Sequence, residues 1–267
     1  MGNLLKSLGL NHIHIIERED PQLKSLVELS KSLRNVELVP VVSLLNGVIS
    51  YRLSCKGEDY WAEFSRSVVR YLSDKDPSSA VISFLESSKC NRLFKEVKKA
   101  RIIKLRNLGF IDELISNLSI YSRDLKRLWL LLANSLGSNK DSKTVVFAVK
   151  MFYYGWFASF NEWLSIPKEV PIPLDVRVAK ATLNSGLLKV NNLKHPKLIN
   201  RLISGTYRRM AINAWRLVSE LSCIPQLNID SVVWLSFNDD VIDRVIAKLP
   251  DECIPVILKL VKMIRGD

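Results

Sequence analysis

Apolar residues recur three and four positions apart along most of this chain, which is the spacing that places them on one face of an α-helix. Trp61, Phe64 and Val68, for example, share one face of a predicted helix. The alternation typical of β-strands is weak, and its best candidate, residues 49–56, lies between helical patterns. Gly47, in the preceding predicted helix, is expected to allow close packing. The pattern therefore predicts an all-α protein of about ten helices.

Capping residues and prolines indicate where several helices begin and end. Asp76 precedes a proline and is expected to start a helix, and Ser122 is expected to cap a helix that stops at Gly137. The proline-rich segment 166–173 excludes a continuous helix there. A new helix is then expected to begin at Asp175.

The charge of the chain points to a class of partner. There are 39 Lys and Arg against 27 Asp and Glu, a formal net charge of +12. Such an excess favours a polyanionic partner, most often nucleic acid, and a basic surface without a specific partner is the alternative. Part of the excess falls in the predicted helix 91–108. Its Lys and Arg cluster can meet phosphate, although a solvated face is the more frequent explanation of such a run.

Several classes of protein do not fit the sequence. No apolar run approaches the roughly 18 residues of a membrane span, and residues 1–20 lack the pattern of a signal peptide, so we expect a cytoplasmic protein with no membrane partner. The cysteines are scattered without CxxC or Cys/His spacing, so neither a zinc site nor an iron–sulfur cluster is expected. The residues expected to be buried thiols in a reducing cytoplasm are Cys55, Cys90, Cys223 and Cys253.

A short polar hairpin connects two predicted helices in the segment GSNKDSKTVVF, residues 137–147. Backbone N–H groups in such a hairpin can hold a phosphate. Asp141 or Ser142 is expected to be the N-cap of the second helix, which places Lys143 in its first turn. A cation there opposes the helix dipole by about 0.3–1 kcal/mol, so the presence of this lysine needs an explanation.

The same position suits a catalytic lysine. A partly desolvated amine near a helix N-terminus holds its proton less tightly, and a neutral amine is a nucleophile that can form a Schiff base. Asp175 supplies a carboxylate at the start of another helix, after the proline-rich segment. The alternatives are that Lys143 is an ordinary surface lysine and that Asp175 is only an N-cap. An N-cap can also take part in catalysis.

Five short segments, taken in their order along the chain, resemble one family. They are REDPQ at 18–22, LLNGVISYRLSCKGEDYW at 44–61, SKTVVFAVKM at 142–151, PIPLDVRVAK at 171–180 and IDSVVWL at 229–235. Together they resemble the archaeal GO glycosylases (AGOG), a branch of the helix–hairpin–helix DNA glycosylase superfamily that removes 8-oxoguanine from DNA. The hairpin LGSNKDS departs from the compact LPGVG type of the wider superfamily, because it is longer and has a single glycine. That departure fits the AGOG branch.

The resemblance implies a helix–hairpin–helix DNA glycosylase fold, with two helical subdomains and the active site in the cleft between them. The first subdomain is expected to comprise about 1–62 and 190–267, and the second about 63–189, with the hairpin and its helices at about 125–157. The resemblance also implies a monomer that acts on DNA containing 8-oxoguanine and needs no metal or organic cofactor.

The resemblance further implies the chemistry. The damaged nucleotide flips out of the duplex, because its base cannot be reached inside the stack. Lys143 attacks C1′ of the deoxyribose, while Asp175 stabilises the positive charge on the sugar and helps to deprotonate the amine. Departure of the base leaves a Schiff base. The imine acidifies the C2′ hydrogen, so the strand breaks on the 3′ side of the lesion by β-elimination.

Residues that contact the damaged base are also implied. Trp61 and Phe147 match aromatic residues that sandwich the flipped base, and Phe147 lies four residues after Lys143 on the same helical face. Gln22 matches a residue that hydrogen-bonds the base. Without the resemblance, the aromatic residues would be interpreted as core, because apolar residues at helical spacing usually are.

Further contacts are implied at two other places. Asp230 and Trp234, four residues apart, match a carboxylate and an indole that contact the purine, and Pro171 belongs to the same implied site. The residues expected to contact the DNA phosphates are Gly137, Ser138, Asn139 and Lys140.

Two other functions are compatible with the residues. A non-catalytic helical protein that binds nucleic acid would have the same charge and hairpin, but it would not need Lys143 together with Asp175. A glycosylase for a different damaged base would share the chemistry and differ in the base pocket.

Overall fold

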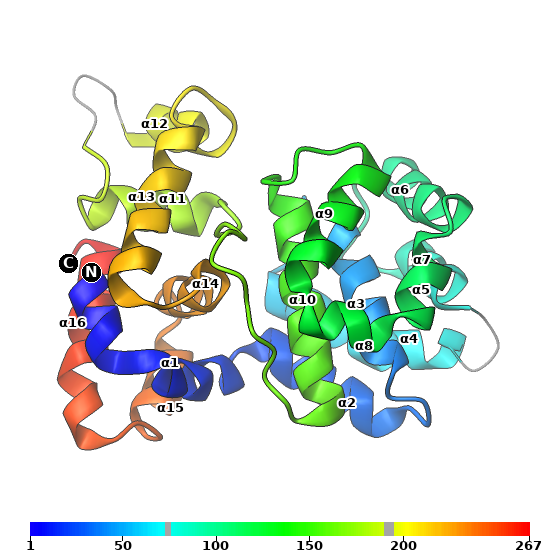
Figure 1. The fold of residues 1–267 in the computed structure, drawn as a ribbon, viewed down its shortest axis with the longest axis horizontal. Helices are drawn as coiled ribbons and strands as arrows, with labels where there is room; N and C mark the ends of the chain where they lie inside the picture. The colour runs from blue at the N-terminus through cyan, green and yellow to red at the C-terminus, as the bar shows by residue number, and fades with distance from the viewer. Residues whose placement is uncertain (73–75, 190–194) are drawn as a thin grey trace. The chain divides into compact units, whose positions relative to one another are not determined.

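The computed structural model describes residues 1–72, 76–189 and 195–267, and the regular elements in these ranges are all helices (Figure 1). They are α1 (Gly2–Arg18), α2 (Pro21–Ser32), α3 (Leu38–Ile49), α4 (Gly57–Leu72), α5 (Pro77–Ser87), α6 (Lys95–Asn107), α7 (Phe110–Ser116), α8 (Leu118–Arg123), α9 (Leu125–Leu136), α10 (Lys143–Phe160), α11 (Val176–Asn184), α12 (His195–Ser204), α13 (Arg208–Ser222), α14 (Gln226–Leu235), α15 (Asp239–Ile246), the short 3-10 helix η1 (Asp251–Cys253) and α16 (Ile254–Arg265). Within these ranges, none of the helices has both the length and the apolar surface that crossing a lipid bilayer requires.

The predicted all-α class is confirmed, and the predicted number of helices is too low. The structure has sixteen α-helices in its described ranges, against the expected number of about ten. Short helices account for much of the difference: α7, α8 and α15 have 7, 6 and 8 residues. A helix of two turns presents too few apolar positions to show a period of its own.

The chain forms two compact units. Unit 1 comprises Met1–Asp20 and Ile166–Asp267, and unit 2 comprises Pro21–Ser165. The sequence-based boundaries, near residues 62 and 189, lie elsewhere. The difference concerns two segments. Residues 21–62, with α2 and α3, belong to unit 2, and residues 166–189, with the proline-rich segment and α11, belong to unit 1.

Packing explains both differences. In unit 2, α2 packs on α4 and α10, and α3 packs along α10, so α2 and α3 belong with the hairpin helices. The proline-rich segment after α10 contributes Ile172 and Leu174 to the core of unit 1. The segment 190–194, where the second boundary was expected, lies outside the described residues.

The contact between α3 and α10 forms the centre of unit 2. A Cβ atom on Gly47 of α3 would lie 2.7 Å from the backbone of Ala148 on α10, which confirms the expected close packing. At the other end of the contact, a Cβ on Gly155 of α10 would lie 2.6 Å from the backbone of Pro40. Cβ atoms do not approach other backbones so closely, so both glycines are needed for the two helices to come together.

Capping residues explain where several helices begin and end. Asp76 accepts hydrogen bonds from two backbone N–H groups in the first turn of α5, and Gly137 ends α9 in the left-handed conformation, both as predicted. The prediction that Ser122 caps α9 is wrong. Asp124 is the cap, accepting from the backbone N–H of Arg127 at 2.9 Å, while Ser122 lies inside the short helix α8. Serine and aspartate are both good N-caps. Because α8 was not predicted, the start of α9 was placed at Ser122 and not after Asp124.

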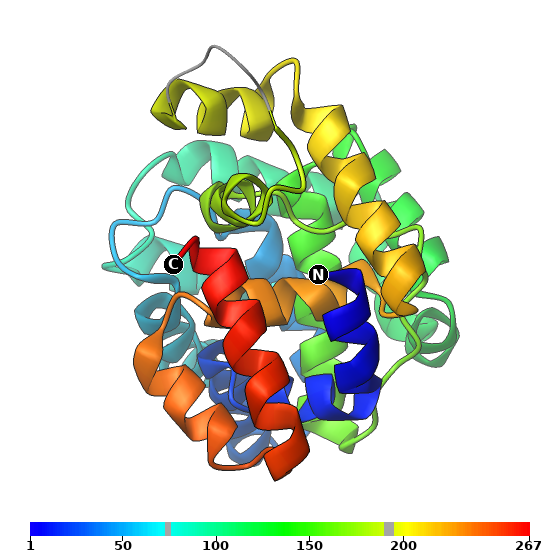
Figure 2. The same cartoon turned by 90° about the vertical axis from the view of Figure 1, so that its left-hand side faces the viewer.

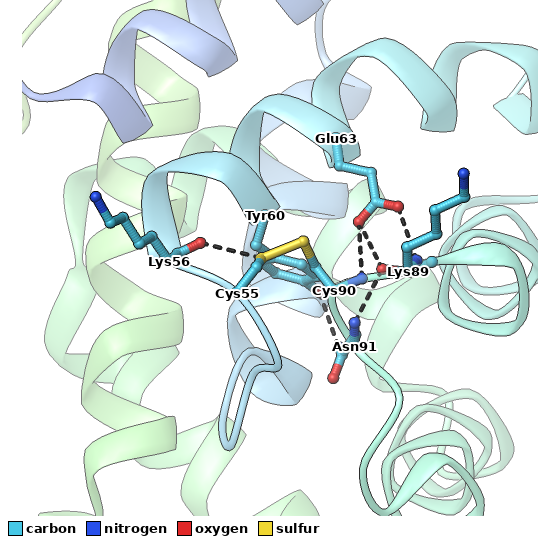
Figure 3. The surroundings of a disulfide bond; sticks show 8 residues. Cys55, Lys56, Tyr60, Glu63, Lys89, Cys90 and Asn91 are labelled. Atoms are coloured by element: carbon cyan, nitrogen blue, oxygen red, sulfur yellow. Dashed lines mark hydrogen bonds between the residues drawn. A yellow bond between two sulfur atoms is a disulfide. The ribbon is translucent and has the colours of Figure 1, made fainter.

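The prediction of four free thiols is wrong for Cys55 and Cys90, which form a disulfide with Cα atoms 5.2 Å apart (Figure 3). It joins the loop after α3 to the loop after α5, where the Ser54 N–H also donates to the carbonyl oxygen of Cys90 at 2.8 Å. The two cysteines are 35 positions apart in sequence, so their pairing depends on the fold and has no local signature. Cys253 is a buried free thiol and Cys223 an exposed one.

Both chain ends contribute to unit 1, where α1 packs against α13, α14 and α16 (Figure 2). The carboxylate of Glu17 on α1 is fully buried. It accepts hydrogen bonds from Asn228 Nδ2 at 3.1 Å and from Ser231 Oγ at 3.0 Å, both on α14. A buried carboxylate is costly unless it is hydrogen-bonded, so these contacts fix α1 to α14.

Gly155→Ala is expected to destabilise the protein, although alanine is the better helix former. The added Cβ would overlap the backbone of Pro40. Overpacking typically costs about 1–3 kcal/mol, against a gain of roughly 1 kcal/mol in helix propensity, so the midpoint of urea unfolding should fall. Ala100→Leu, at an exposed position of α6, is the control and should leave the midpoint nearly unchanged. A raised midpoint for Gly155→Ala would contradict the close packing.

Candidate active site

The hairpin between α9 and α10 is closed by backbone hydrogen bonds. Gly137 has φ 62° and its N–H donates to Asn134, while the Ser138 N–H reaches back to the Ala133 carbonyl at 3.0 Å. Asn139 accepts from the Asp141 N–H through its side chain at 2.9 Å. These bonds satisfy the last carbonyls of α9 and shape a compact turn, which leaves Gly137 and Asn139 exposed.

Trp129 of α9 anchors the tip of this hairpin. Its indole Nε1–H donates to the Lys140 carbonyl at 2.7 Å, and the Lys140 ammonium lies 5.1 Å from the centre of the indole ring. One aromatic side chain therefore contacts both the backbone and the charge of the same lysine. Of the four residues expected to contact phosphate, Lys140 brings a positive charge that is exposed and held in place.

The basic helix α6 lies against the hairpin, which the sequence alone did not reveal. Lys104 Nζ donates to the Leu136 carbonyl at 3.0 Å, and Arg101 donates to Thr144 Oγ1 at 3.1 Å. Lys98 is fully buried, and burial lowers the pKa of its ammonium to about 8. The basic run is therefore not simply a solvated face, because part of it supports the two ends of the hairpin.

Lys143 is the first residue of α10, as predicted, and Ser142 is the N-cap. The Ser142 side chain makes no capping hydrogen bond, although the helix starts there. Lys143 is half-buried. The structure therefore places a half-buried lysine at the positive end of a helix, directly after the hairpin, on the helix that packs along α3.

Asp175 is the N-cap of α11, also as predicted. Its Oδ1 accepts from the Val178 N–H at 3.0 Å, which orients the carboxylate at the start of the helix. The preceding segment is fixed by Gln226, which accepts from the Ile172 N–H at 3.2 Å. Pro171 is buried in that segment. The stiff segment and the cap together define the position of Asp175 within unit 1.

Trp61 and Phe147 are brought together in unit 2. Their ring centres lie 6.2 Å apart at an interplanar angle of 67°, an edge-to-face contact. Trp61 is 1% exposed and also packs edge-on against Phe64, whereas Phe147 is partly exposed. In this structure the two rings pack against each other, so a base between them would require one ring to turn. Both residues thus have a packing role in unit 2, and their contact with the base stays a prediction.

The polar residues expected to contact the base are nearly covered. Gln22 is the second residue of α2 and 5% exposed, and Asp230 lies in the middle of α14 and is 4% exposed. Polar side chains that are buried are held by hydrogen bonds, so both are restricted in orientation. Gln22 belongs to unit 2 and Asp230 to unit 1.

Trp234 has a partner that the sequence did not indicate. The guanidinium carbon of Arg177, in the first turn of α11, lies 3.9 Å from the centre of the Trp234 ring on α14. This cation–π contact restricts the orientation of the indole. Arg177 is only two residues after Asp175, but its pairing with an indole more than fifty positions away depends on how α11 meets α14.

The predicted residues divide between the two units. Unit 2 holds the hairpin, the Lys143 amine, the two aromatic rings and Gln22. Unit 1 holds the Asp175 carboxylate, Pro171, Asp230 and Trp234. The amine and the carboxylate of the expected imine chemistry therefore lie at helix starts in different units.

Comparison with known proteins decides between the functions left open above. Residues 2–248 match the sequence profile of AGOG, described as N-glycosylase/DNA lyase. The chain belongs to the AGOG family. A non-catalytic DNA-binding protein is thereby set aside, and the enzyme is an N-glycosylase and DNA lyase.

Individual AGOG relatives are similar over most of the chain. The N-glycosylase/DNA lyase of Thermococcus kodakarensis is 35% identical over 86% of this chain and 80% of its own length. That of Methanopyrus kandleri is 32% identical over 92% of both chains. A solved structure of the 8-oxoguanine DNA glycosylase of Pyrobaculum aerophilum, an AGOG complexed with 8-oxoguanosine, has a TM-score of 0.75 at 23% identity. It is matched over 100% of this chain and 94% of that one, which supports the AGOG fold.

Trp129→Phe is expected to weaken DNA binding by this AGOG protein. Phenylalanine keeps a ring beside Lys140 but removes the donor to its carbonyl, a hydrogen bond worth about 0.5–1.5 kcal/mol, so affinity should fall about 2- to 12-fold. Fluorescence anisotropy with a labelled duplex measures this. Trp156→Phe is the matched control, because it removes the indole bond to Glu162 within the same unit. Equal losses in both variants would show that the hairpin anchor has no special role.

Proposed function

We propose that this enzyme excises 8-oxoguanine from DNA, with Lys143 as the nucleophile and Asp175 as its acidic partner. The observation that carries the proposal is the position of Lys143, the first residue of α10 directly after the hairpin. A structural lysine is unfavourable there, while a Schiff-base lysine is not. The solved relative bound to 8-oxoguanosine supports the choice of substrate.

The first step is displacement of the base. The damaged nucleotide flips out of the stack, and the neutral amine of Lys143 donates its electron pair to C1′ of the deoxyribose. The bond from C1′ to N9 breaks, and its electrons leave with the purine. Asp175 stabilises the positive charge that develops on the sugar and takes the proton released by the amine. Before it takes that proton, the Asp175 carboxylate lies at the N-terminus of α11, where the helix dipole favours an anion.

The second step is strand cleavage. The C1′–O4′ bond of the adduct breaks, O4′ takes a proton from water, and a protonated imine remains between the Lys143 nitrogen and C1′. The imine withdraws electrons and so acidifies the C2′ hydrogen. Loss of that proton expels the 3′ phosphate by β-elimination, and hydrolysis of the imine then frees the amine. Every step of the proposed route uses residues of the chain and water.

Base recognition is proposed to combine stacking with polar contacts. Trp61 and Phe147 are proposed as the stacking faces once one ring turns, and stacking on an aromatic ring is worth roughly 1–3 kcal/mol per base. Stacking cannot separate 8-oxoguanine from guanine, because both have nearly the same π-face. The lesion differs by a carbonyl at C8 and an N7–H donor, so an acceptor such as the Gln22 side-chain carbonyl is required. Asp230 is proposed to accept from the N–H groups on the opposite edge of the purine, with Pro171 and Trp234 completing the site.

The hairpin residues Gly137, Ser138, Asn139 and Lys140 are proposed to bind the DNA phosphates. Support comes from the exposed turn and from the cations of α6 beside it. We further propose that the enzyme acts as a monomer on genomic DNA in the cytoplasm.

Lys143→Gln is expected to abolish covalent trapping by borohydride on a duplex that carries 8-oxoguanine. The amide cannot form an imine, so no reducible intermediate arises. The measurement is the yield of cross-linked complex on a denaturing gel, with binding of the same duplex followed separately. Lys259→Gln removes an exposed lysine of α16, away from the proposed site, and should keep its trapping. Trapping of Lys143→Gln at the wild-type level would refute the assignment.

Gln22→Met is expected to reduce selectivity for the lesion, because methionine keeps the volume and removes the carbonyl acceptor. An unmade hydrogen bond in a dry pocket costs roughly 1–3 kcal/mol, so the ratio of 8-oxoguanine to guanine excision should fall about 5- to 150-fold. Single-turnover excision from otherwise identical duplexes measures this ratio. Phe147→Ala serves as the comparison and should weaken both substrates about equally. An unchanged ratio in Gln22→Met would assign the discrimination to another acceptor, such as a backbone carbonyl.

A further inference from the structure

Trp234 is the exception on α14, because its side chain is the one that the core does not cover completely. Every other residue of this helix, Gln226–Leu235, is buried, whereas Trp234 is half-buried. An indole is large and apolar, so leaving part of it in water on an otherwise buried helix forgoes packing that the core could use. The ring thus keeps surface available for a ligand.

The guanidinium of Arg177 lies over this ring. Its central carbon is 3.9 Å from the ring centre, so the cation is in direct contact with one face of the indole. A ligand cannot reach the face that the guanidinium covers. The opposite face and the edge of the Trp234 ring are the parts that remain for a purine.

Arg177 occupies a position that is unfavourable for a structural arginine. It is the second residue of α11, and the positive end of the helix dipole disfavours a cation in the first turn. No acidic side chain follows the Asp175 cap within that turn. Helix stability therefore does not explain the arginine, whereas its contact with Trp234 does.

The helices that carry this pair are held firmly within unit 1. On α11, Thr182 Oγ1 accepts from the Trp215 indole N–H at 2.8 Å, and Asn184 Nδ2 donates to the Ile264 carbonyl at 3.1 Å. Helix α14 is bonded to α1 through the Glu17 carboxylate. Because both helices are fixed, the contact between arginine and indole fixes the orientation of the ring itself.

Arg177 also lies in the turn that holds the proposed acid. The Asp175 carboxylate accepts from the Val178 N–H at 3.0 Å, so residues 175–178 form one hydrogen-bonded turn with Arg177 inside it. In the proposed mechanism the carboxylate acts on the sugar, and Trp234 contacts the purine of the same nucleotide. One turn of unit 1 therefore carries the carboxylate and the cation that orients the indole.

We infer that Arg177 is a positioning residue for the damaged base. It holds the Trp234 indole in the orientation that meets the flipped purine, while Asp175 in the same turn acts on the sugar. Without the cation the indole can rotate about its side-chain torsions, and the purine is placed less well for attack at C1′. The inference rests on the proposed excision of 8-oxoguanine, and it adds a residue outside the predicted set.

The first test compares Arg177→Met on two substrates, a duplex that carries 8-oxoguanine and the same duplex with a preformed abasic site. Methionine keeps much of the length of the side chain and removes the charge. Single-turnover excision of 8-oxoguanine, at enzyme concentrations below half-saturation, should slow about 2- to 30-fold, the range expected for one cation–π contact. Cleavage of the abasic duplex should keep the wild-type rate, because that substrate has no base to place.

Two further variants control for charge and for loss of structure. Arg216→Met makes the same change at an exposed arginine of α13 in the same unit, and it should process both duplexes as the wild type does. Arg177→Lys keeps a cation that can reach the ring, so it should recover part of the excision rate that Arg177→Met loses. Urea unfolding of each variant reports whether the fold is retained.

The second test measures the coupling between the two side chains. Trp234→Leu should slow excision of 8-oxoguanine and leave cleavage of the abasic duplex unchanged. Adding Arg177→Met to Trp234→Leu should have no further effect, because the ring that the cation orients is already absent. A double-mutant cycle of the four proteins gives this coupling directly.

Three results would overturn the inference. One is excision of 8-oxoguanine by Arg177→Met at the wild-type rate. Another is an equal loss on both duplexes, which would mean that the substitution disturbs Asp175 and not the base. The third is losses that multiply in the double variant. Excision and borohydride trapping by the wild type are measured in parallel: if they are intact, these failures leave the proposed function standing, whereas a wild type that does not excise 8-oxoguanine removes the proposed function itself.

Discussion

The close contact of α3 with α10 is the constraint on which the rest of unit 2 depends. Gly47 and Gly155 let the two helices approach at both ends of the contact, so α10 has one position and one rotation relative to α3. Lys143 begins α10 and Phe147 follows on the next turn. The position of Lys143 is therefore determined by the packing of α10 in the core of unit 2. The hairpin before it takes no part in that packing, so its residues can be polar and exposed.

Positive charge is concentrated around that hairpin, and the structure offsets its repulsion locally. Lys104 donates to the last carbonyl of α9, where the helix dipole favours a cation, and the Lys140 ammonium lies beside the Trp129 indole. Neither contact neutralises the charge, since both partners are uncharged. The cations are held in fixed places and stay available for phosphate, in keeping with a DNA lyase of the AGOG family.

Features with a local cause could be predicted from the sequence, and features with a tertiary cause could not. The helical class, the end of α9 at Gly137 and the starts of α10 and α11 follow from periodicity, a left-handed glycine and N-caps within a few residues. The Cys55–Cys90 bond and the Arg177–Trp234 contact join residues far apart in sequence, and no spacing rule reveals them. The unit boundaries likewise depend on which helices pack together. Most of the site residues were predicted from the family resemblance and not from periodicity or capping.

The way the chain builds its two units has a consequence for its synthesis. Unit 2 is one continuous stretch, whereas unit 1 needs both ends of the chain, because α1 packs on α13, α14 and α16 and Glu17 accepts hydrogen bonds from α14. On the ribosome, unit 2 emerges whole and can fold while the rest is still being translated. Helix α1 cannot pack on α14 until residues more than two hundred positions later have been synthesised. Until then the Glu17 carboxylate and the apolar face of α1 are exposed to water. The first part of the chain to be synthesised is thus among the last to be packed, and a chain that ended after unit 2 would contain Lys143 without Asp175.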